Sequence, residues 1–286
     1  MHVTFFAADK DREYEVARPL RHGIVQHGDT CEIVRAADFR GPAKKTDCAV
    51  MIGVKGWSKL LMEQHRHVNK HVVYIDKGYM RRNGYYRMSV NAFQPIDYFQ
   101  ARMRPSDRFE KLNLKTQPMQ KKGSGEHIVL AGGSVKYAMW HEMPSMDHID
   151  PMTTWARKQI RLLNKLQHRP IVYRPKPSWR DAVEIEGVEY SRLPRTIEHE
   201  LENAYCLITF GSNAGVDAVR LGVPVIILGD GAAQPMGVTD LKKVNRLVYP
   251  RDIDRDQWLY DLAYCQFTTD EMNTGLAWKI LKERMA

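Results

Sequence analysis

Short apolar runs alternate with helical patterns along this chain, in two series separated by a linker. The expected strands are four or five residues long, and they lie at 3–7, 31–34, 48–52 and 72–75 in the first series and at 127–131, 170–173, 206–210 and 225–228 in the second. Such continuous apolar runs are typical of strands buried on both faces of a parallel sheet. We therefore predict an α/β protein with two Rossmann-like domains, each built on a parallel sheet covered by helices.

The linker sets the expected domain boundary. Residues 116–125 read Thr-Gln-Pro-Met-Gln-Lys-Lys-Gly-Ser-Gly, a composition typical of a connection rather than of a packed element. We predict a first domain at 1–122 and a second at 126–270. A last helix at 271–286 follows the second domain, and it is placed where it could cross back onto the first.

Two turns of small residues follow strands of the second domain. Gly132-Gly133-Ser134 follows the strand at 127–131, and Gly211-Ser212-Asn213 follows the strand at 206–210 and precedes a helix. Small residues allow a ligand to approach the backbone, and the free N–H groups at a helix start favour a phosphate. We expect both turns to face one crevice at the carboxyl edge of the sheet. The alternative is an ordinary strand–helix turn with Asn213 as its cap.

Three charged residues nearby have the chemistry of a nucleotide site. Arg174 and Lys176 lie in Tyr-Arg-Pro-Lys-Pro, where the prolines hold the loop extended. They are placed to neutralise a diphosphate, because Arg binds phosphate oxygens through two parallel hydrogen bonds. Asp217 lies one turn into the helix after Gly211-Ser212-Asn213 and is expected to accept hydrogen bonds from ribose hydroxyls. A stiff surface loop with two solvated cations is the alternative for Arg174 and Lys176.

In this order, these motifs resemble the donor half of GT-B glycosyltransferases. Ser212, Asp217-Ala218 and Gly222-x-Pro224 match residues that recur around the phosphates and ribose in that family. Asp230 and Gln234 fall where the family often has an adjacent Asp-Gln pair near the sugar hydroxyls, although here they are not adjacent. The resemblance covers residues 127–240 and reaches the first domain by architecture only. It implies a nucleotide-sugar donor in the second domain, an acceptor in the first, no metal and no further cofactor.

The excess positive charge lies in the first half of the sequence. Residues 1–125 hold 23 Lys and Arg against 13 Asp and Glu, whereas residues 126–286 hold 20 against 21. A one-sided basic balance indicates a polyanionic partner. The alternatives are another acidic partner and a surface that serves only solubility.

Among GT-B enzymes, phage DNA glucosyltransferases have such an acceptor, and the chain looks like a distant relative of them. The resemblance implies sugar transfer to a hydroxymethylated pyrimidine in DNA, with UDP-glucose as the expected donor and the base turned out of the duplex. The basic, aromatic stretch at 77–108 suits this task. The expected nucleic-acid contacts are Lys55, Arg81, Arg82, Tyr85, Arg87, Arg102 and Arg104.

A transferase that inverts the anomeric carbon needs a general base for the acceptor hydroxyl. Asp76 follows the strand at 72–75 and should face the cleft from the carboxyl edge. Asp9, after the first strand, is the second candidate. A helix cap or a salt bridge to a nearby arginine is the alternative role for Asp76.

The remaining composition places limits on the class of protein. There is no apolar run of about 18 residues, and the first residues form a strand pattern rather than a signal peptide. The four cysteines lack zinc-ligand spacing, so we expect reduced thiols in a cytoplasmic protein, the host cytoplasm if the chain is phage-encoded. Two other functions stay open: a GT-B transferase or epimerase acting on a polysaccharide or small acceptor, and a non-catalytic DNA-binding protein with a transferase fold.

Overall fold

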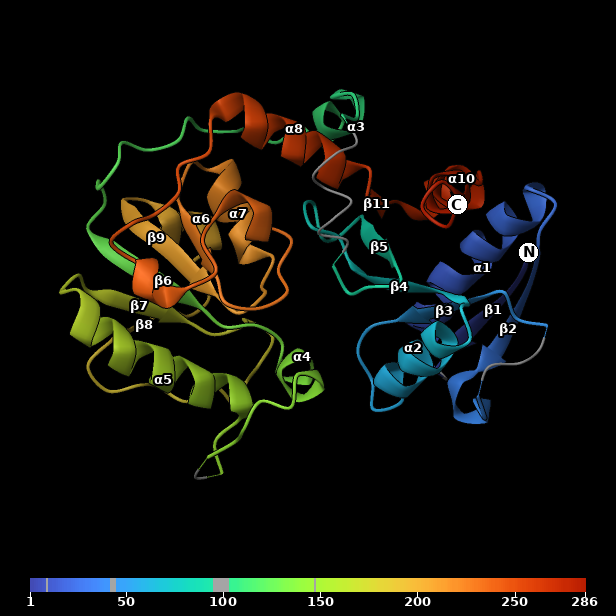
Figure 1. Cartoon of the computed structure of the whole chain (residues 1–286), viewed down its shortest axis with the longest axis horizontal. Coiled ribbons are helices and arrows are strands. Elements are labelled where there is room, and N and C mark those ends of the chain that lie inside the picture. The colour runs from blue at the N-terminus through green and yellow to red at the C-terminus, as the bar shows by residue number, and fades with distance from the viewer. Residues whose placement is uncertain (9, 42–44, 95–102, 147) are drawn as a thin grey trace. The chain divides into compact units, whose positions relative to one another are not determined.

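The computed structural model describes residues 1–8, 10–41, 45–94, 103–146 and 148–286. They belong to two compact units, shown in Figure 1. Unit 1 comprises Met1–Pro95 and Asp261–Ala286, and unit 2 comprises Ile96–Tyr260. Each unit is an α/β body around its own sheet.

Unit 1 is built on a six-stranded sheet of order β11-β5-β4-β3-β1-β2. Its strands are β1 (His2–Ala7), β2 (Thr30–Arg35), β3 (Cys48–Ile52), β4 (His71–Lys77), β5 (Tyr86–Val90) and β11 (Gln266–Phe267). The first four are parallel, with Val3 paired to Cys48 and Ile52 to Ile75. β5 and β11 extend the sheet as antiparallel strands. The parallel strands carry the apolar runs predicted from the sequence because both faces of the sheet are covered.

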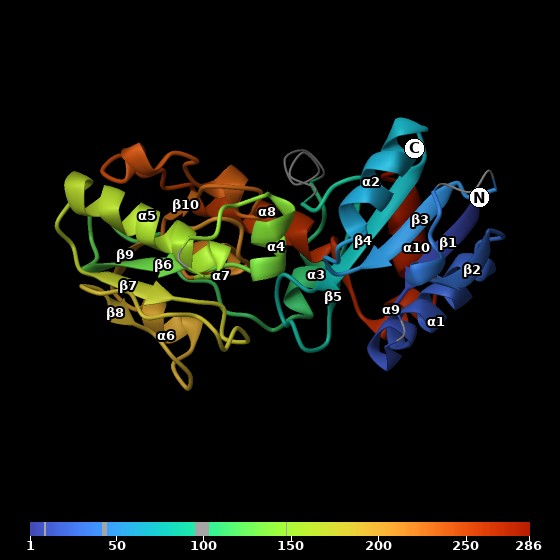
Figure 2. The ribbon, with the colours of Figure 1, turned by 90° about the horizontal axis from the view of Figure 1, so that it is seen from below.

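Helices from both ends of the chain complete unit 1. They are α1 (Asp11–Gln26), α2 (Ser58–His67), α9 (Thr269–Asn273) and α10 (Leu276–Lys282), with a 3-10 turn at Ala36–Asp38. α1 and α9 pack backbone to backbone at Gly23, where a Cβ would overlap the carbonyl of Met272. Figure 2 shows α9 and α10 beside α1. The C-terminal helix therefore returns to the first domain, as the sequence indicated.

The carboxylate of Asp29 holds the C-terminal helix α10 in unit 1. It accepts hydrogen bonds from the indole Nε1 of Trp278 at 2.7 Å and from Nζ of Lys282 at 2.9 Å. Trp278 is fully buried in the core of unit 1. A buried carboxylate needs such donors, since it would otherwise lose its hydration without replacement.

Unit 2 is built on a five-stranded sheet of order β10-β9-β6-β7-β8, in which every pair is parallel. Its strands are β6 (His127–Ala131), β7 (Ile171–Arg174), β8 (Glu189–Tyr190), β9 (Ala204–Thr209) and β10 (Val225–Ile227). Its helices are α3 (Asp107–Glu110), α4 (Val135–Trp140), α5 (Pro151–Leu166), α6 (Ile197–Leu201) and α7 (Ala214–Arg220), and α8 (Asp252–Ala263) leads out of it, with 3-10 turns at Gln234–Met236 and Leu241–Lys243. α5 and α6 cover opposite faces of the sheet (Figure 2), which makes it doubly wound.

The two units divide at residues 95–96 and 260–261, whereas the sequence placed the boundary between 122 and 126. The difference lies in the segment that we expected to be a linker. Gln117 N–H donates to the carbonyl of Arg220, and Gln120 N–H donates to that of Gly222. Gly222 has φ 76°, and a Cβ there would overlap the carbonyl of Pro118. The segment therefore packs along the end of α7 in unit 2.

No helix in the described part of the chain is long and apolar enough to cross a bilayer. All four cysteines lie in the described residues, where they are buried and form no disulfide. Burial raises the pKa of the Cys31 thiol to about 12, and it raises the pKa of Cys48 and Cys206 as well. A buried protonated thiol acts as a small apolar side chain.

Candidate functional site

The strand order of unit 2 places its topological switch point between β6 and β9. The chain leaves β6 toward β7 and β8 on one side, then returns to β9 on the other side of β6. Ligands of open α/β sheets bind at such a switch point, beyond the carboxyl ends of the strands. Ala131 is paired with Thr209, the last residues of these two strands. The turns that follow them, 132–134 and 210–213, therefore lie side by side, as the sequence predicted.

The first turn offers an unused backbone donor. Gly132 N–H donates to the carbonyl of Arg174 at 2.8 Å, and a Cβ at Gly132 would lie 3.2 Å from Pro175 Cα. Gly133 is buried, yet its N–H makes no hydrogen bond within the described ranges. Buried N–H groups without a partner are rare in native proteins. The N–H of Gly133 is therefore suited to an anionic ligand, and half-buried Ser134 stands next to it.

The second turn uses its own hydroxyl groups. Ser212 N–H donates to Thr209 Oγ1 at 3.1 Å, and Ala214 N–H donates to Ser212 Oγ at 3.3 Å. Asn213 makes no side-chain cap to α7, which has only seven residues. The expected phosphate site at this helix start is thus partly occupied by the protein's own groups, and the capping role considered for Asn213 is absent.

Gly211 is explained by packing rather than by room for a ligand. A Cβ at this position would lie 2.6 Å from the carbonyl oxygen of Asp230 and 3.0 Å from Cε1 of Tyr137. The absence of a side chain lets the turn after β10 close against the turn after β9. We expected a glycine at this position to allow a ligand to approach the backbone. The structure corrects this, because the glycine is required by packing.

Asp217 points into the protein. Its side chain is only 10% exposed and lies 3.9 Å from the guanidinium of Arg220. Arg220 in turn donates to the carbonyl of Lys115 at 2.6 Å. The structure thus places Asp217 in the packing of residues 115–118 against α7. Its proposed contact with ribose remains a prediction and would require this pair to open.

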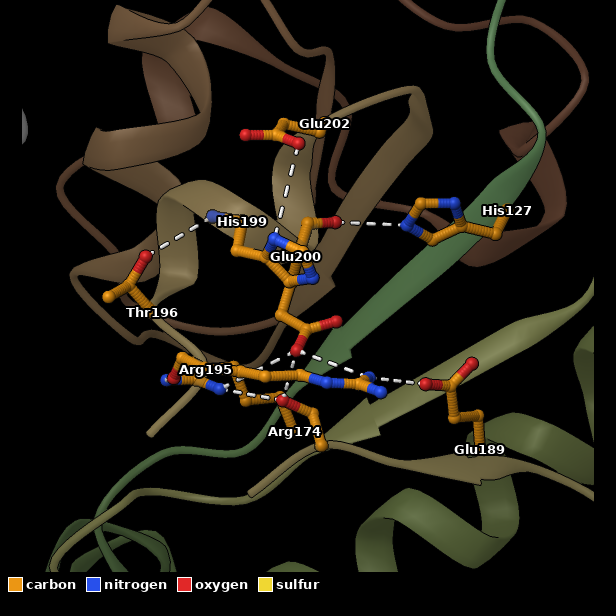
Figure 3. A network of polar contacts seen from close by, with 9 residues as sticks. His127, Arg174, Glu189, Arg195, Thr196, His199, Glu200 and Glu202 are labelled. Carbon is orange, nitrogen blue, oxygen red and sulfur yellow. Dashed lines mark hydrogen bonds and ion pairs between the residues drawn. The ribbon is translucent and has the colours of Figure 1, made fainter. Parts of the chain in front are cut away.

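Arg174 has a structural role in place of the expected one. It is buried, and it donates to Ser191 Oγ at 2.6 Å and to the carbonyl of Arg195 at 2.8 Å. Figure 3 shows its guanidinium directed at the buried carboxylate of Glu200, 3.9 Å away. The guanidinium of Arg174 therefore links β7, β8 and α6 through contacts within the protein. It does not face a diphosphate site. Lys176 is exposed on the loop after β7, and its contact with a diphosphate stays a prediction.

An aromatic cluster at the switch point escaped the sequence analysis. Tyr137 and His141, one turn apart at α4, both pack against Phe210, the first residue after β9. The Tyr137 hydroxyl donates to the carbonyl of Asp230 at 2.8 Å, and His141 Nε2 lies 3.9 Å from Asp230 Oδ2. The structure thus brings Asp230 to the same edge as both turns. Gln234, in the 3-10 turn that follows, is half exposed.

Asp76 of unit 1 lies at the expected edge of its sheet. β3 ends at Ile52, opposite Ile75, so Asp76 extends beyond the parallel pairing. Its carboxylate is 40% exposed and lies 3.6 Å from Arg87 Nη2. The Tyr74 hydroxyl donates to it at 2.9 Å. Asp76 is thus both partly open to solvent and engaged in the salt bridge that was its alternative role.

Asp9, the second candidate base, lies outside the described residues. A carboxylate that the sequence analysis did not select stands close by in the chain. Glu13 is buried at the start of α1, and it accepts hydrogen bonds from the N–H of Ala8 at 2.7 Å and from Lys55 Nζ at 2.5 Å. This ion pair sits at the switch point of unit 1, between the ends of β1 and β3. Lys55 also lies 5.3 Å from the ring centre of Trp57, so the structure gives it partners within the protein.

The residues expected to bind nucleic acid are divided between the two units and differ in burial. Arg81, Arg82 and Tyr85 lie between β4 and β5, where Arg81 is exposed. Arg87 is buried, with its guanidinium 5.0 Å from the ring of Tyr74, and it donates to the carbonyl of Phe93. Arg104 belongs to unit 2, and Arg102 lies outside the described residues. Arg87 is therefore corrected from a phosphate contact to a core cation.

The charge difference between the sequence halves disappears between the units. Unit 1 holds 19 Lys and Arg against 14 Asp and Glu, and unit 2 holds 24 against 20. The change arises because the basic residues 103–122 belong to unit 2. The observation that favoured DNA as the partner of the first domain loses its force.

The acidic residues at the start of α8 are paired with arginines. Asp252, Asp254 and Asp256 alternate at the start of α8, and each forms an ion pair with Arg251 or Arg255. In the described part of the chain, no cluster of His, Cys, Asp and Glu is arranged to hold a metal ion.

Comparison with known proteins gives the fold class. No family model matches the chain, and no curated protein matches it in sequence. Among solved structures it is similar to KpsC of Thermosulfurimonas dismutans, a beta Kdo 2,4 transferase, at 14% identity over 94% of this chain and 92% of the other, with a TM-score of 0.55. It is also similar to the beta Kdo 2,7 transferase of KpsC from the same organism, at 14% identity over 97% and 99% of the two chains, with a TM-score of 0.50.

At this identity the likeness shows the fold alone. Two doubly wound α/β domains with mostly parallel sheets, similar to GT-B-type transferases, confirm the fold class predicted from the sequence. The comparisons do not bear out a likeness to phage DNA glucosyltransferases, so the acceptor is a matter for proposal.

Proposed function

We propose that this protein is a glycosyltransferase of the GT-B kind, which takes a sugar from a nucleotide-sugar donor held at the carboxyl edge of unit 2. The observation that carries the proposal is the buried N–H of Gly133, unpaired within the described ranges, at the switch point between β6 and β9. A backbone donor at this place suits a phosphate oxygen. The half-exposed turn at 211–213 and the exposed Lys176 border the same edge.

For the acceptor, we propose a saccharide that contains an acidic sugar. The two similar structures are named for Kdo, the acidic sugar that they transfer, which supports an acidic sugar in the donor or in the growing saccharide. The nearly equal positive balance of the two units, 19 against 14 and 24 against 20 charged residues, fits an anionic acceptor without favouring a long polyanion on one unit.

Hydroxymethylated DNA is the second candidate acceptor. It is supported by the exposed Arg81, with Arg82 and Tyr85 beside it, between β4 and β5. On this alternative, Asp76 or Asp9 would accept the proton of the hydroxymethyl group. Binding to phosphates through these arginines would weaken steeply with salt.

A transfer assay tests the donor and the acceptor together. It offers nucleotide-activated glucose, GlcNAc and Kdo, each with a Kdo-ended oligosaccharide or with DNA that contains 5-hydroxymethyl-pyrimidines. Transfer to the saccharide supports the first proposal, and transfer to DNA establishes the second. No binding of any activated sugar contradicts both.

A variant at Gly133 links the assay to the site. Its φ is not in the left-handed region, and an added Cβ would meet Met152 at an ordinary 3.5 Å. Gly133→Ala should therefore fold normally, yet place a methyl group beside the free N–H. We expect about tenfold weaker donor binding, equal to about 1.4 kcal/mol. Gly84→Ala, with no atom within 4 Å of its Cβ, is the matched control in unit 1.

A further inference from the structure

Resting on the proposed donor site, we propose that the pair His141–Asp230 assists departure of the nucleotide from the sugar. The two residues come from different turns, His141 from the end of α4 and Asp230 from the turn after β10. They meet over Phe210, which begins the turn after β9. The pair thus stands at the switch point itself.

Aromatic rings hold the imidazole in place. The ring of Tyr137 lies edge-on to it with centres 4.5 Å apart, and the ring of Phe210 does so at 5.1 Å. Trp155 supports Phe210 from behind, at 6.3 Å. The side chain of His141 is 24% exposed, so the ring is held by its neighbours and remains partly open to solvent.

The backbone of Asp230 is fixed, and its carboxylate is open. The Tyr137 hydroxyl donates to its carbonyl oxygen, and Gly211 and Gly231 approach closely because neither has a side chain. The carboxylate is 56% exposed and lies 3.9 Å from Nε2 of His141, which is itself buried. The 3.9 Å separation is longer than a hydrogen bond, so the carboxylate acts on the imidazole through its charge, which favours the protonated ring. Among the described residues, the phenol of Tyr137 is a second titratable group beside the ring.

The charges at this edge of the sheet indicate what the pair His141–Asp230 does in the reaction. Arg174, the cation expected to stabilise the phosphate, is buried against Glu200. When the bond between the sugar C1 and the phosphate oxygen breaks, the electron pair stays on that oxygen. The imidazolium of His141 donates its proton to this oxygen, and Asp230 stabilises the charge before the transfer. The acceptor oxygen forms the new bond to C1, and its proton leaves to a base on the acceptor side. Donors aimed at developing charge contribute strongly to such steps.

The chain contains a matched control pair. His199 and Glu202 of unit 2 lie 4.0 Å apart, with side chains 59% and 75% exposed (Figure 3). They have the chemistry and separation of His141 and Asp230, at another place. Substitutions there report any general effect of removing such a pair.

The test measures donor turnover, as transfer or hydrolysis, together with donor affinity for His141→Ala, Asp230→Asn, His199→Ala and Glu202→Gln. We expect His141→Ala to lower kcat about 100-fold, the low end for a lost acid catalyst, with nearly unchanged donor affinity. Added imidazole should restore part of the rate. Asp230→Asn should lower kcat less, and the control variants should match the wild type.

The outcomes separate this inference from the proposed function. If the wild type turns over the donor and His141→Ala does so equally, the inference fails and the proposed function stands. Parallel loss of affinity and rate, with no rescue by imidazole, also overturns it, since His141 would then only bind the donor. If the wild type binds no activated sugar, both fail. Should His141→Ala not fold, Asp230→Asn, altered at a mostly exposed side chain, decides by its kcat.

Discussion

At the switch point of unit 2, small residues line two adjacent turns, and a backbone donor at Gly133 has no partner in the described ranges. At the switch point of unit 1, the buried ion pair of Glu13 and Lys55 occupies the corresponding place. Both sheets are doubly wound, so each has a topological switch point at which a ligand could bind. The difference lies in whether polar groups at the edge are already satisfied. Free groups at one edge and satisfied ones at the other are the reason for assigning the donor to unit 2.

The largest expected effect is on stability, at Arg174 in unit 2, where we predict a structural role and no role in donor binding. Arg174→Met leaves the buried Glu200 with the exposed Arg195, 3.8 Å away, as its only arginine partner among the described residues, and weakening a buried pair in this way costs up to about 3–5 kcal/mol. We expect a loss of this size in urea unfolding, with donor affinity of the folded protein nearly unchanged. If the variant keeps its stability but loses donor affinity, Arg174 binds the donor phosphates after all, and its assignment as a structural residue is wrong.

A smaller effect is expected at Asp29 in unit 1. Burial opposes ionisation, but hydrogen bonds from the amino group of Met1, from Trp278 and from Lys282 prevail and lower the pKa of Asp29 from 3.8 to about 2. This stabilisation is complete above pH 3.8 and is lost as the pH falls toward 2. At neutral pH it amounts to about 2 kcal/mol.

Asp29→Asn should therefore lower the stability of unit 1 near pH 7 and flatten its acid dependence between pH 4 and 2. Urea unfolding followed at both ends of that range measures the change. An unchanged acid profile would show that the carboxylate does not hold the C-terminal helices. Donor binding by unit 2 should not respond.

The smallest effect is expected at His65, also in unit 1. Its side chain is fully buried beside Phe39 and Phe6, Nδ1–H donates to the carbonyl of Leu61, and Nε2 is unpaired among the described residues. Burial lowers the pKa of His65 below its usual 6.5. The folded state thus favours the neutral ring, so stability is retained above pH 6.5 and decreases as the pH falls below it. His65→Leu should reduce this decrease, as measured by unfolding at pH 7.5 and 5.5, and an equal decrease in both proteins would refute the assignment.

Local sequence patterns predicted the parts of the fold that are encoded locally. The strands β1, β3, β6 and β9 were recognisable because each is a continuous buried run. β8 and β11 have two residues each and exist only through their neighbours, so no periodicity marks them. The boundary was drawn at a linker-like composition, which carries no information about the packing of residues 115–120 on α7.

The candidate site shows the same limit. The two small-residue turns were found because strand, turn and helix signals are adjacent in the chain. The role of Arg174 depends on Ser191 and Glu200, 17 and 26 residues away in the chain, and no spacing rule predicts that partnership. His141 and Asp230 meet only because α4 and the turn after β10 converge on Phe210.

Amide hydrogen exchange with and without an activated sugar tests whether the donor binds to unit 2. It reports on the carboxyl edges of both sheets in one experiment. We expect the donor to slow exchange in residues 132–136 and 210–214 of unit 2. We also expect no change in residues 53–57 and 76–87 of unit 1. Protection confined to unit 1, or donor binding without protection of Gly133, would contradict the assignment of the donor site.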